Sequence, residues 1–168
     1  MVHEEGPTEG ETHLKTSTKV VFITLVIAVL ALLANPVGPL GGFWRPAADV
    51  PNPAGIQRAL FLVIFVVEAI ALGLGVSFLL YGFPLARAVS VASPGLTRAV
   101  HLAIAWLLLN WWAHDSQHTH FGMHNVNALL GIESGFHFTI ILSGLILLSF
   151  LLVGWRSKMR PTTEPVVR

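Results

Sequence analysis

Long apolar runs alternate with short polar segments along this chain, and four of the runs have the length of membrane helices. They cover about residues 20–40, 59–82, 96–115 and 129–155. A helix of about 20 predominantly apolar residues crosses the hydrocarbon core of a bilayer. The pattern therefore predicts an all-α integral membrane protein, whose four transmembrane helices form an up-down bundle.

The polar residues that interrupt the runs set the boundaries of the predicted domain. Asn35 and Pro36 follow the uninterrupted apolar stretch Val20–Ala34, so the first helix is expected to end or kink there. A cleaved signal peptide is the alternative for this run, but the acidic segment before it differs from a short basic leader. We expect one transmembrane domain over residues 19–157, with solvated, flexible tails at 1–18 and 158–168.

Composition supports a lipid environment and excludes several kinds of chemistry. Of the 168 residues, 54% are hydrophobic and 11% are charged, whereas soluble domains carry about 25% charged residues. The chain has no cysteine, which excludes disulfides, iron–sulfur clusters and thiolate zinc sites. Its net charge of +1 gives no basic surface for nucleic acid, so no nucleic-acid partner is expected.

The distribution of Lys and Arg predicts the orientation in the membrane. With four spans, both tails and the connection between the second and third spans share one side. That side holds Lys15, Lys19, Arg87, Arg98, Arg156, Lys158, Arg160 and Arg168, and the other side holds Arg45 and Arg58. Because cytoplasmic segments are enriched in Lys and Arg, we expect both termini to be cytoplasmic, in the cell (inner) membrane.

A histidine-rich segment lies between the third and fourth runs, on the predicted extracytoplasmic side. His114 and His118 are spaced i, i+4, which places two imidazoles on one helix face. Glu133 and His137 have the same spacing near the start of the fourth run. Imidazole and carboxylate groups together suit copper, iron or zinc. The candidate metal-binding residues are His114, Asp115, His118, His120, His124, Glu133 and His137. The alternative is a solvated hairpin whose histidines contact lipid headgroups or a partner protein.

Two further ionisable residues lie inside the predicted spans, where such groups are costly and often functional. Glu68, in the second span, is a candidate proton-relay or ligand-anchoring acid, or a protonated carboxyl that bonds to a neighbouring helix, with Asn110 as the first partner to consider. His101 could bind haem or chlorophyll, or it could form an ordinary hydrogen bond. The small residues Gly73, Gly75, Gly131, Gly135 and Gly144 predict close helix packing.

Two functions from different classes are consistent with this pattern. In the first, the chain is a small membrane subunit with an extracytoplasmic metal site, within a larger oxidoreductase or monooxygenase complex. In the second, it is a non-catalytic accessory or assembly subunit of a respiratory or photosynthetic complex, whose hairpin docks a partner or whose histidines ligate haem or chlorophyll. A stand-alone enzyme is not expected, because no nucleotide motif, phosphate loop or nucleophile–base pair is present. The expected partners are the bilayer and other membrane subunits or further copies of the chain.

Overall fold

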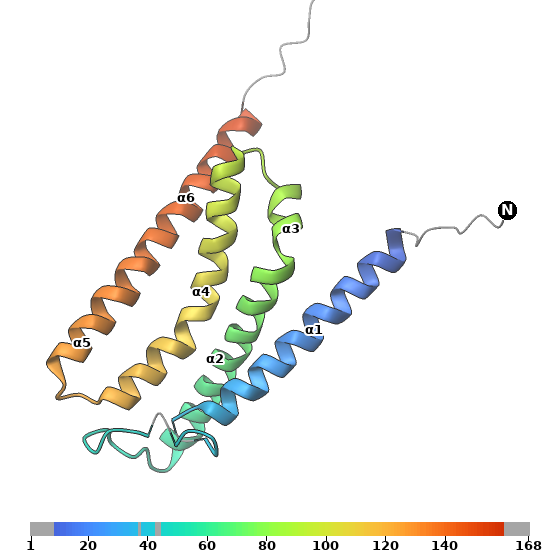
Figure 1. The fold of residues 1–168 in the computed structure, drawn as a ribbon. Helices are drawn as coiled ribbons and strands as arrows, with labels where there is room; N and C mark the ends of the chain where they lie inside the picture. The colour runs from blue at the N-terminus through green and yellow to red at the C-terminus, as the bar shows by residue number, and fades with distance from the viewer. Residues whose placement is uncertain (1–8, 37, 43–44, 160–168) are drawn as a thin grey trace, which may run out of the picture.

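The computed structural model describes residues 9–36, 38–42 and 45–159, and every regular element in these ranges is a helix. The elements are α1 (Glu9–Ala34), α2 (Ile56–Tyr81), α3 (Phe83–Ala88), α4 (Pro94–Phe121), α5 (Val126–Ile132), the π-helical segment η1 (Glu133–His137) and α6 (Phe138–Met159). The last three follow one another without a break and form one long rod (Figure 1). The prediction of an all-α protein is confirmed for this part of the chain.

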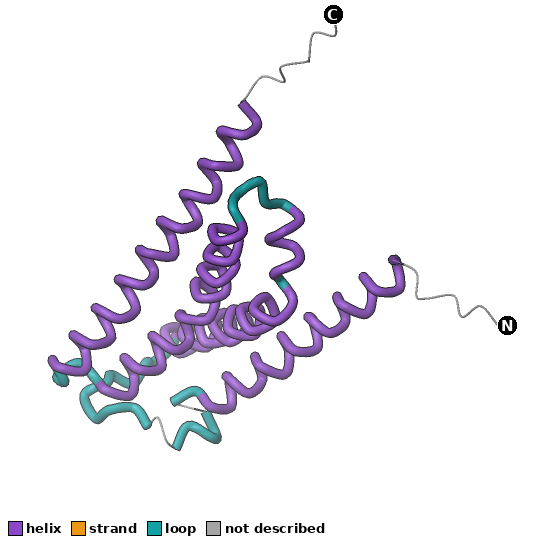
Figure 2. The backbone as a smooth tube through the Cα atoms, turned by 45° about the horizontal axis from the view of Figure 1, so that its top comes forward, coloured by secondary structure: helices purple, strands orange, loops and turns teal. Residues whose placement is uncertain are grey.

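The long helices pack in chain order as an open row. α1 packs against α2, α2 against α4, and α4 against α6. Figures 1 and 2 both show α1 at one edge of the row and the α5–η1–α6 rod at the other. The loop between α1 and α2 and the turn between α4 and α5 lie at the same end of the row (Figure 1). This arrangement brings two segments together that are distant in sequence.

Three helices are long and apolar enough to cross a membrane: Thr16–Ala34, Ile56–Tyr81 and Val126–Met159. Large apolar side chains on all three are exposed, among them Phe22, Leu62 and Leu145. A soluble protein would bury side chains of this kind, so the surface suits lipid or an apolar partner. α4 is not one of the three, so the predicted count of four membrane helices is not confirmed.

Small and polar residues hold α1 close to α2, as the sequence predicts for Gly73. A Cβ atom on Gly73 would overlap the backbone carbonyl of Thr24, so only glycine permits this approach. Nearby, the hydroxyls of Thr24 and Ser77 lie 2.8 Å apart, and Ser77 Oγ also donates to the Val20 carbonyl at 3.1 Å. Hydrogen bonds between small residues at close helix approaches are common in membrane proteins.

The glycines of the last rod do not play this role in the described structure. Gly75 on α2 does lie against Leu109 of α4, where an added Cβ would come within 2.8 Å of the Leu109 side chain. By contrast, a Cβ on Gly131, Gly135 or Gly144 would meet no atom within 4 Å. The predicted close packing at these three positions is therefore wrong for contacts among the described residues, where all three glycines are exposed.

α4 is longer than the apolar pattern predicts, and this extension makes the candidate site. Ser93 caps its first turn by accepting a hydrogen bond from the Leu96 amide at 3.3 Å, and Pro94 occupies the first helical position. The helix then continues past residue 115 to Phe121. Most of the histidine-rich segment is thus helical, so His114 and His118 do share one face.

Candidate metal centre

Two histidines of α4 and one acid of η1 bring their ligand atoms together. His114 Nε2 and His118 Nε2 lie 3.2 Å apart, and His118 Nε2 lies 3.3 Å from Glu133 Oε1. The ligand atoms of these three residues all lie within 4.8 Å of one another. The group could hold a metal ion.

Two of the three separations, at 3.2 and 3.3 Å, are close to those between ligands of one metal ion. With bonds of about 2.0–2.2 Å in a tetrahedral site, neighbouring ligand atoms lie about 3.3–3.6 Å apart. His118 Nε2 approaches both a second imidazole nitrogen and a carboxylate oxygen. A ring nitrogen carries at most one proton, so His118 Nε2 can donate a hydrogen bond to only one of these two atoms. A cation bound between them would accept a lone pair from each of the three groups.

The π-helical turn determines how Glu133 and His137 are presented. A π-helix inserts an extra residue into a helical turn and is frequent at functional sites. Across this turn, His137 Nδ1 lies 2.6 Å from Oε2, the second oxygen of the Glu133 carboxylate. A second hydrogen bond of this kind orients a metal-binding carboxylate. This contact of His137 fixes the orientation of the Glu133 carboxylate, and the His137 ring lies 5.3 Å from that of His114.

Aromatic contacts attach the π-helical turn to α4. Phe136 stacks on Trp106 with ring centroids 5.9 Å apart, and it also meets the His114 ring edge-on at 5.3 Å. Trp106 Nε1 donates to Thr139 Oγ1 at 2.9 Å. Because Phe136 directly precedes His137 and also contacts His114, these contacts position both sides of the candidate site. Sequence reasoning did not single out Trp106 or Phe136, which had only their apolar character as a signal.

The site is accessible to an incoming ion. The His118 side chain is 26% exposed, and those of Glu133 and His137 are 47% and 53% exposed. His114 lies deeper and is half-buried. An ion could therefore reach the three candidate side chains from solvent.

His120 and His124, which the sequence grouped with these ligands, lie elsewhere. His120 Nδ1 lies 3.2 Å from the Arg45 carbonyl oxygen, and His124 Nδ1 lies 2.6 Å from Asp49 Oδ2. Both partners belong to the loop between α1 and α2. The structure therefore separates the histidine-rich segment into a metal-capable group and a loop-binding group.

Asp49 connects that loop to the end of α4. Its Oδ2 also accepts hydrogen bonds from the backbone amides of Met123 and His124, at 2.7 and 2.8 Å. The His124 side chain, followed by these amides, lowers the pKa of Asp49 below its ordinary value despite some desolvation. The Ala47 amide donates to the Thr119 carbonyl at 3.1 Å, which satisfies one of the free carbonyls at the end of α4. We call these contacts of residues 45–49 with residues 119–124 the loop clip.

Gly122 ends α4 inside the loop clip. Its φ of 75° is rarely adopted by residues with a side chain, and a Cβ would also overlap Asp49 Oδ1 and approach the Ala47 Cβ to 2.6 Å. Both the backbone conformation and the space require glycine. The loop clip thereby fixes the last turn of α4, which carries His118.

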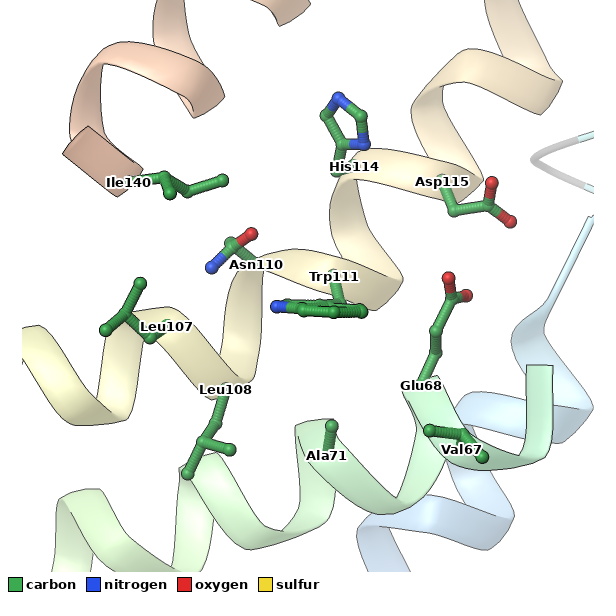
Figure 3. A pocket seen from close by; sticks show the side chains of 10 residues that line it. All are labelled: Val67, Glu68, Ala71, Leu107, Leu108, Asn110, Trp111, His114, Asp115 and Ile140. Carbon is green, nitrogen blue, oxygen red and sulfur yellow. The ribbon is translucent and has the colours of Figure 1, made fainter. Parts of the chain in front are cut away.

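The two remaining acids predicted as functional lie between α2 and α4 instead. Asp115 lies one position after His114, and Figure 3 shows the Glu68 carboxyl group pointing from α2 towards the part of α4 that carries Asp115. Asp115 does not join the metal-capable group of His114, His118 and Glu133. The Asn110 amide nitrogen donates to the Trp106 carbonyl at 2.7 Å, and Asn110 lines the same pocket as Glu68.

His101 lies far from this end of α4 and has a hydrogen-bond partner. Its Nε2 lies 3.2 Å from the Phe78 carbonyl oxygen, and the ring packs between Phe78 and Phe83. An axial haem or chlorophyll ligand would need this nitrogen, so cofactor binding would break the contact with Phe78. In comparisons with protein-family models, curated proteins and solved structures, no match to this chain was found.

Proposed function

We propose that this chain is a four-span membrane protein that binds one transition-metal ion through His114, His118 and Glu133. The observation that carries the proposal is the convergence of the three ligand atoms, with neighbouring separations of 3.2 and 3.3 Å. Such distances are those of ligands around one small cation. His137 orients Glu133 in this arrangement.

α4 acts as the fourth span in this proposal. Its most polar intramembrane residues, His101 and Asn110, are buried against neighbouring helices, at 5% and 2% exposure. Polar groups with protein partners are tolerated at membrane depth. The excess of Lys and Arg beside the termini then gives cytoplasmic N- and C-termini in the cell (inner) membrane, with the metal centre on the outer side.

Two imidazoles and one carboxylate leave coordination positions for water, oxygen or a transferred ligand. Catalytic metal sites keep such an open position, whereas structural zinc sites are closed by four protein ligands. The same ligand set suits non-haem iron, and imidazole also suits copper and zinc. We therefore assign the chain a metal-dependent role in a membrane oxidoreductase or monooxygenase complex.

The exposed glycines and apolar side chains of the last rod favour assembly with other subunits. Its exposed positions combine glycines with large apolar side chains, among them Gly131, Gly135 and Leu142. Small residues let a second helix approach closely. An accessory subunit without bound metal is the competing function, and metal analysis separates the two.

The experiment compares the metal content of the native chain with that of matched single-residue variants. The native chain, purified from membranes in mild detergent without a histidine tag, is analysed for copper, iron and zinc per chain. We expect about one ion, and a loss of affinity on the order of 100-fold or more in His118→Ala and in Glu133→Gln. His124→Ala, which removes a histidine of the same segment, should retain the metal because two backbone amides still bind Asp49.

Circular dichroism of each variant verifies that the helices are intact. The metal assignment is wrong if the native chain carries no ion and binds none on titration with Zn²⁺. It is equally wrong if His118→Ala and His124→Ala bind the same amount. Either result leaves the accessory role as the function to test, by identifying the subunits that co-purify with the chain.

A further inference from the structure

A second polar site lies on the other side of α4, where that helix packs against α2. A pocket of about 560 Å³ opens there, lined mainly by apolar side chains. Its polar lining consists of Glu68, Asn110, His114 and Asp115, shown together in Figure 3. Pockets of this size with apolar walls and a few converging polar groups are typical of small-molecule sites.

Glu68 is the residue of this pocket that indicates a bound ligand. The residue is 7% exposed, and its Oε2 is buried without a hydrogen-bond partner among the residues that the structure describes. Figure 3 shows the Glu68 carboxyl group directed into the pocket, towards Asp115. A buried carboxyl oxygen without a partner is costly, and two carboxylates that face each other repel. A bound cation relieves both.

We infer that the pocket binds an apolar molecule with a primary ammonium group. An ammonium group has three N–H donors. The pocket offers acceptors for them in the two carboxyl groups and the Asn110 side chain. Trp111 supplies an aromatic ring beside this position, and aromatic rings attract organic cations.

The pocket walls determine the remainder of the ligand. Ala71, Leu107, Leu108 and Ile140 surround the polar groups with hydrocarbon. Val67 and Trp111, which line the pocket as well, are 54% and 58% exposed on the outer surface of the helix row. A ligand can therefore enter from the lipid side, with its ammonium group at Glu68 and its alkyl chain along Val67. This inference does not rest on the metal centre, because Glu68 is no part of it.

Direct binding of n-octylamine tests the inference. The full chain is placed in lipid nanodiscs, and radiolabelled octylamine bound above the level of matched empty nanodiscs is measured. We expect saturable binding of about one molecule per chain. Affinity should be at least tenfold lower in Glu68→Gln, which keeps the size of the side chain but removes its charge. Unlabelled n-octanol, with the same chain length and no charge, should not compete.

A second pair of variants tests the pocket itself. Ala71→Phe fills the pocket without changing an acid and should also weaken binding. Ile70→Phe adds the same ring on the neighbouring position, which is exposed and does not line the pocket, and it should bind as the native chain does. The inference is overturned if no saturable binding occurs, if Glu68→Gln binds equally well, or if octanol competes as strongly as the amine.

Discussion

Replacement of Gly122 by alanine should free the end of α4 that carries His118. The residue has φ 75° and ψ −174°, a region that is essentially restricted to glycine. Placing alanine there costs about 1–3 kcal/mol. A tenfold change in an equilibrium corresponds to about 1.4 kcal/mol, so the open form of the last turn should become about 5- to 150-fold more populated.

The change in the loop clip should also increase the population of this open form. The new methyl group would overlap Asp49 Oδ1, so the carboxylate must move away from the Met123 and His124 amides that it accepts from. Those two amides then lose their partner, and the Ala47 side chain must move as well, because the new methyl group would approach its Cβ to 2.6 Å. Hydrogen exchange of the peptide covering residues 115–124, followed by mass spectrometry, measures this opening directly.

Gly42→Ala is the matched control. Gly42 lies in the loop between α1 and α2, has no positive φ, and an added Cβ would meet nothing within 4 Å. We expect its exchange pattern to equal that of the native chain. The reasoning is refuted if Gly122→Ala exchanges residues 115–124 at the native rate, or if Gly42→Ala accelerates them as much.

Three further predictions follow from other contacts. Because hydrogen bonds lower the folded pKa of Asp49, its contribution to the loop clip should be complete above the ordinary value near 4 and disappear as the pH falls through the folded pKa. Hydrogen-exchange protection factors, which are corrected for the intrinsic effect of pH on exchange, should therefore fall for residues 119–124 of the native chain as the pH is lowered through this range, and Asp49→Asn should remove this fall. Gly73→Ala should lower the free energy of unfolding by about 1–3 kcal/mol, because α1 must move away from α2. Gly144→Ala is its control, and the midpoint of its thermal unfolding should equal or slightly exceed that of the native chain. Zn²⁺ should weaken octylamine binding severalfold if both sites are occupied as proposed, since His114 lies at both, and octylamine should weaken Zn²⁺ binding by the same factor.

The sequence predicts the helices well because their signals are local. Long apolar runs identify α1, α2 and the last rod, and Asn35 and Pro36 mark the end of α1 as observed at Ala34. The start of α1 was not predicted, because the helix begins at Glu9 in a polar segment that was expected to be a flexible tail. The i, i+4 spacing likewise places His114 and His118 on one face once α4 is known to continue that far. These features depend only on residues within a few turns of one another.

The parts that could not be predicted depend on distant contacts. Asp49 binds amides 74 and 75 residues away along the chain, and no local pattern pairs it with His124. The π-helical turn is stabilised by Phe136 on Trp106, a contact between two separate helices. Without these contacts, the sequence assigns all the histidines of the segment to a single site.

The geometry of α4 explains why its polar residues divide into separate groups. Successive residues are rotated by about 100°, so His114 and His118 differ by about 40°, whereas His120 lies about 200° from His118. With α2 on one side of the helix and η1 on the other, His118 faces Glu133 and Asp115 faces Glu68. His114 belongs to the metal-capable group and also lines the pocket. If the two sites are occupied as proposed, two cations approach each other across this one residue, so the field of either one must oppose binding of the other.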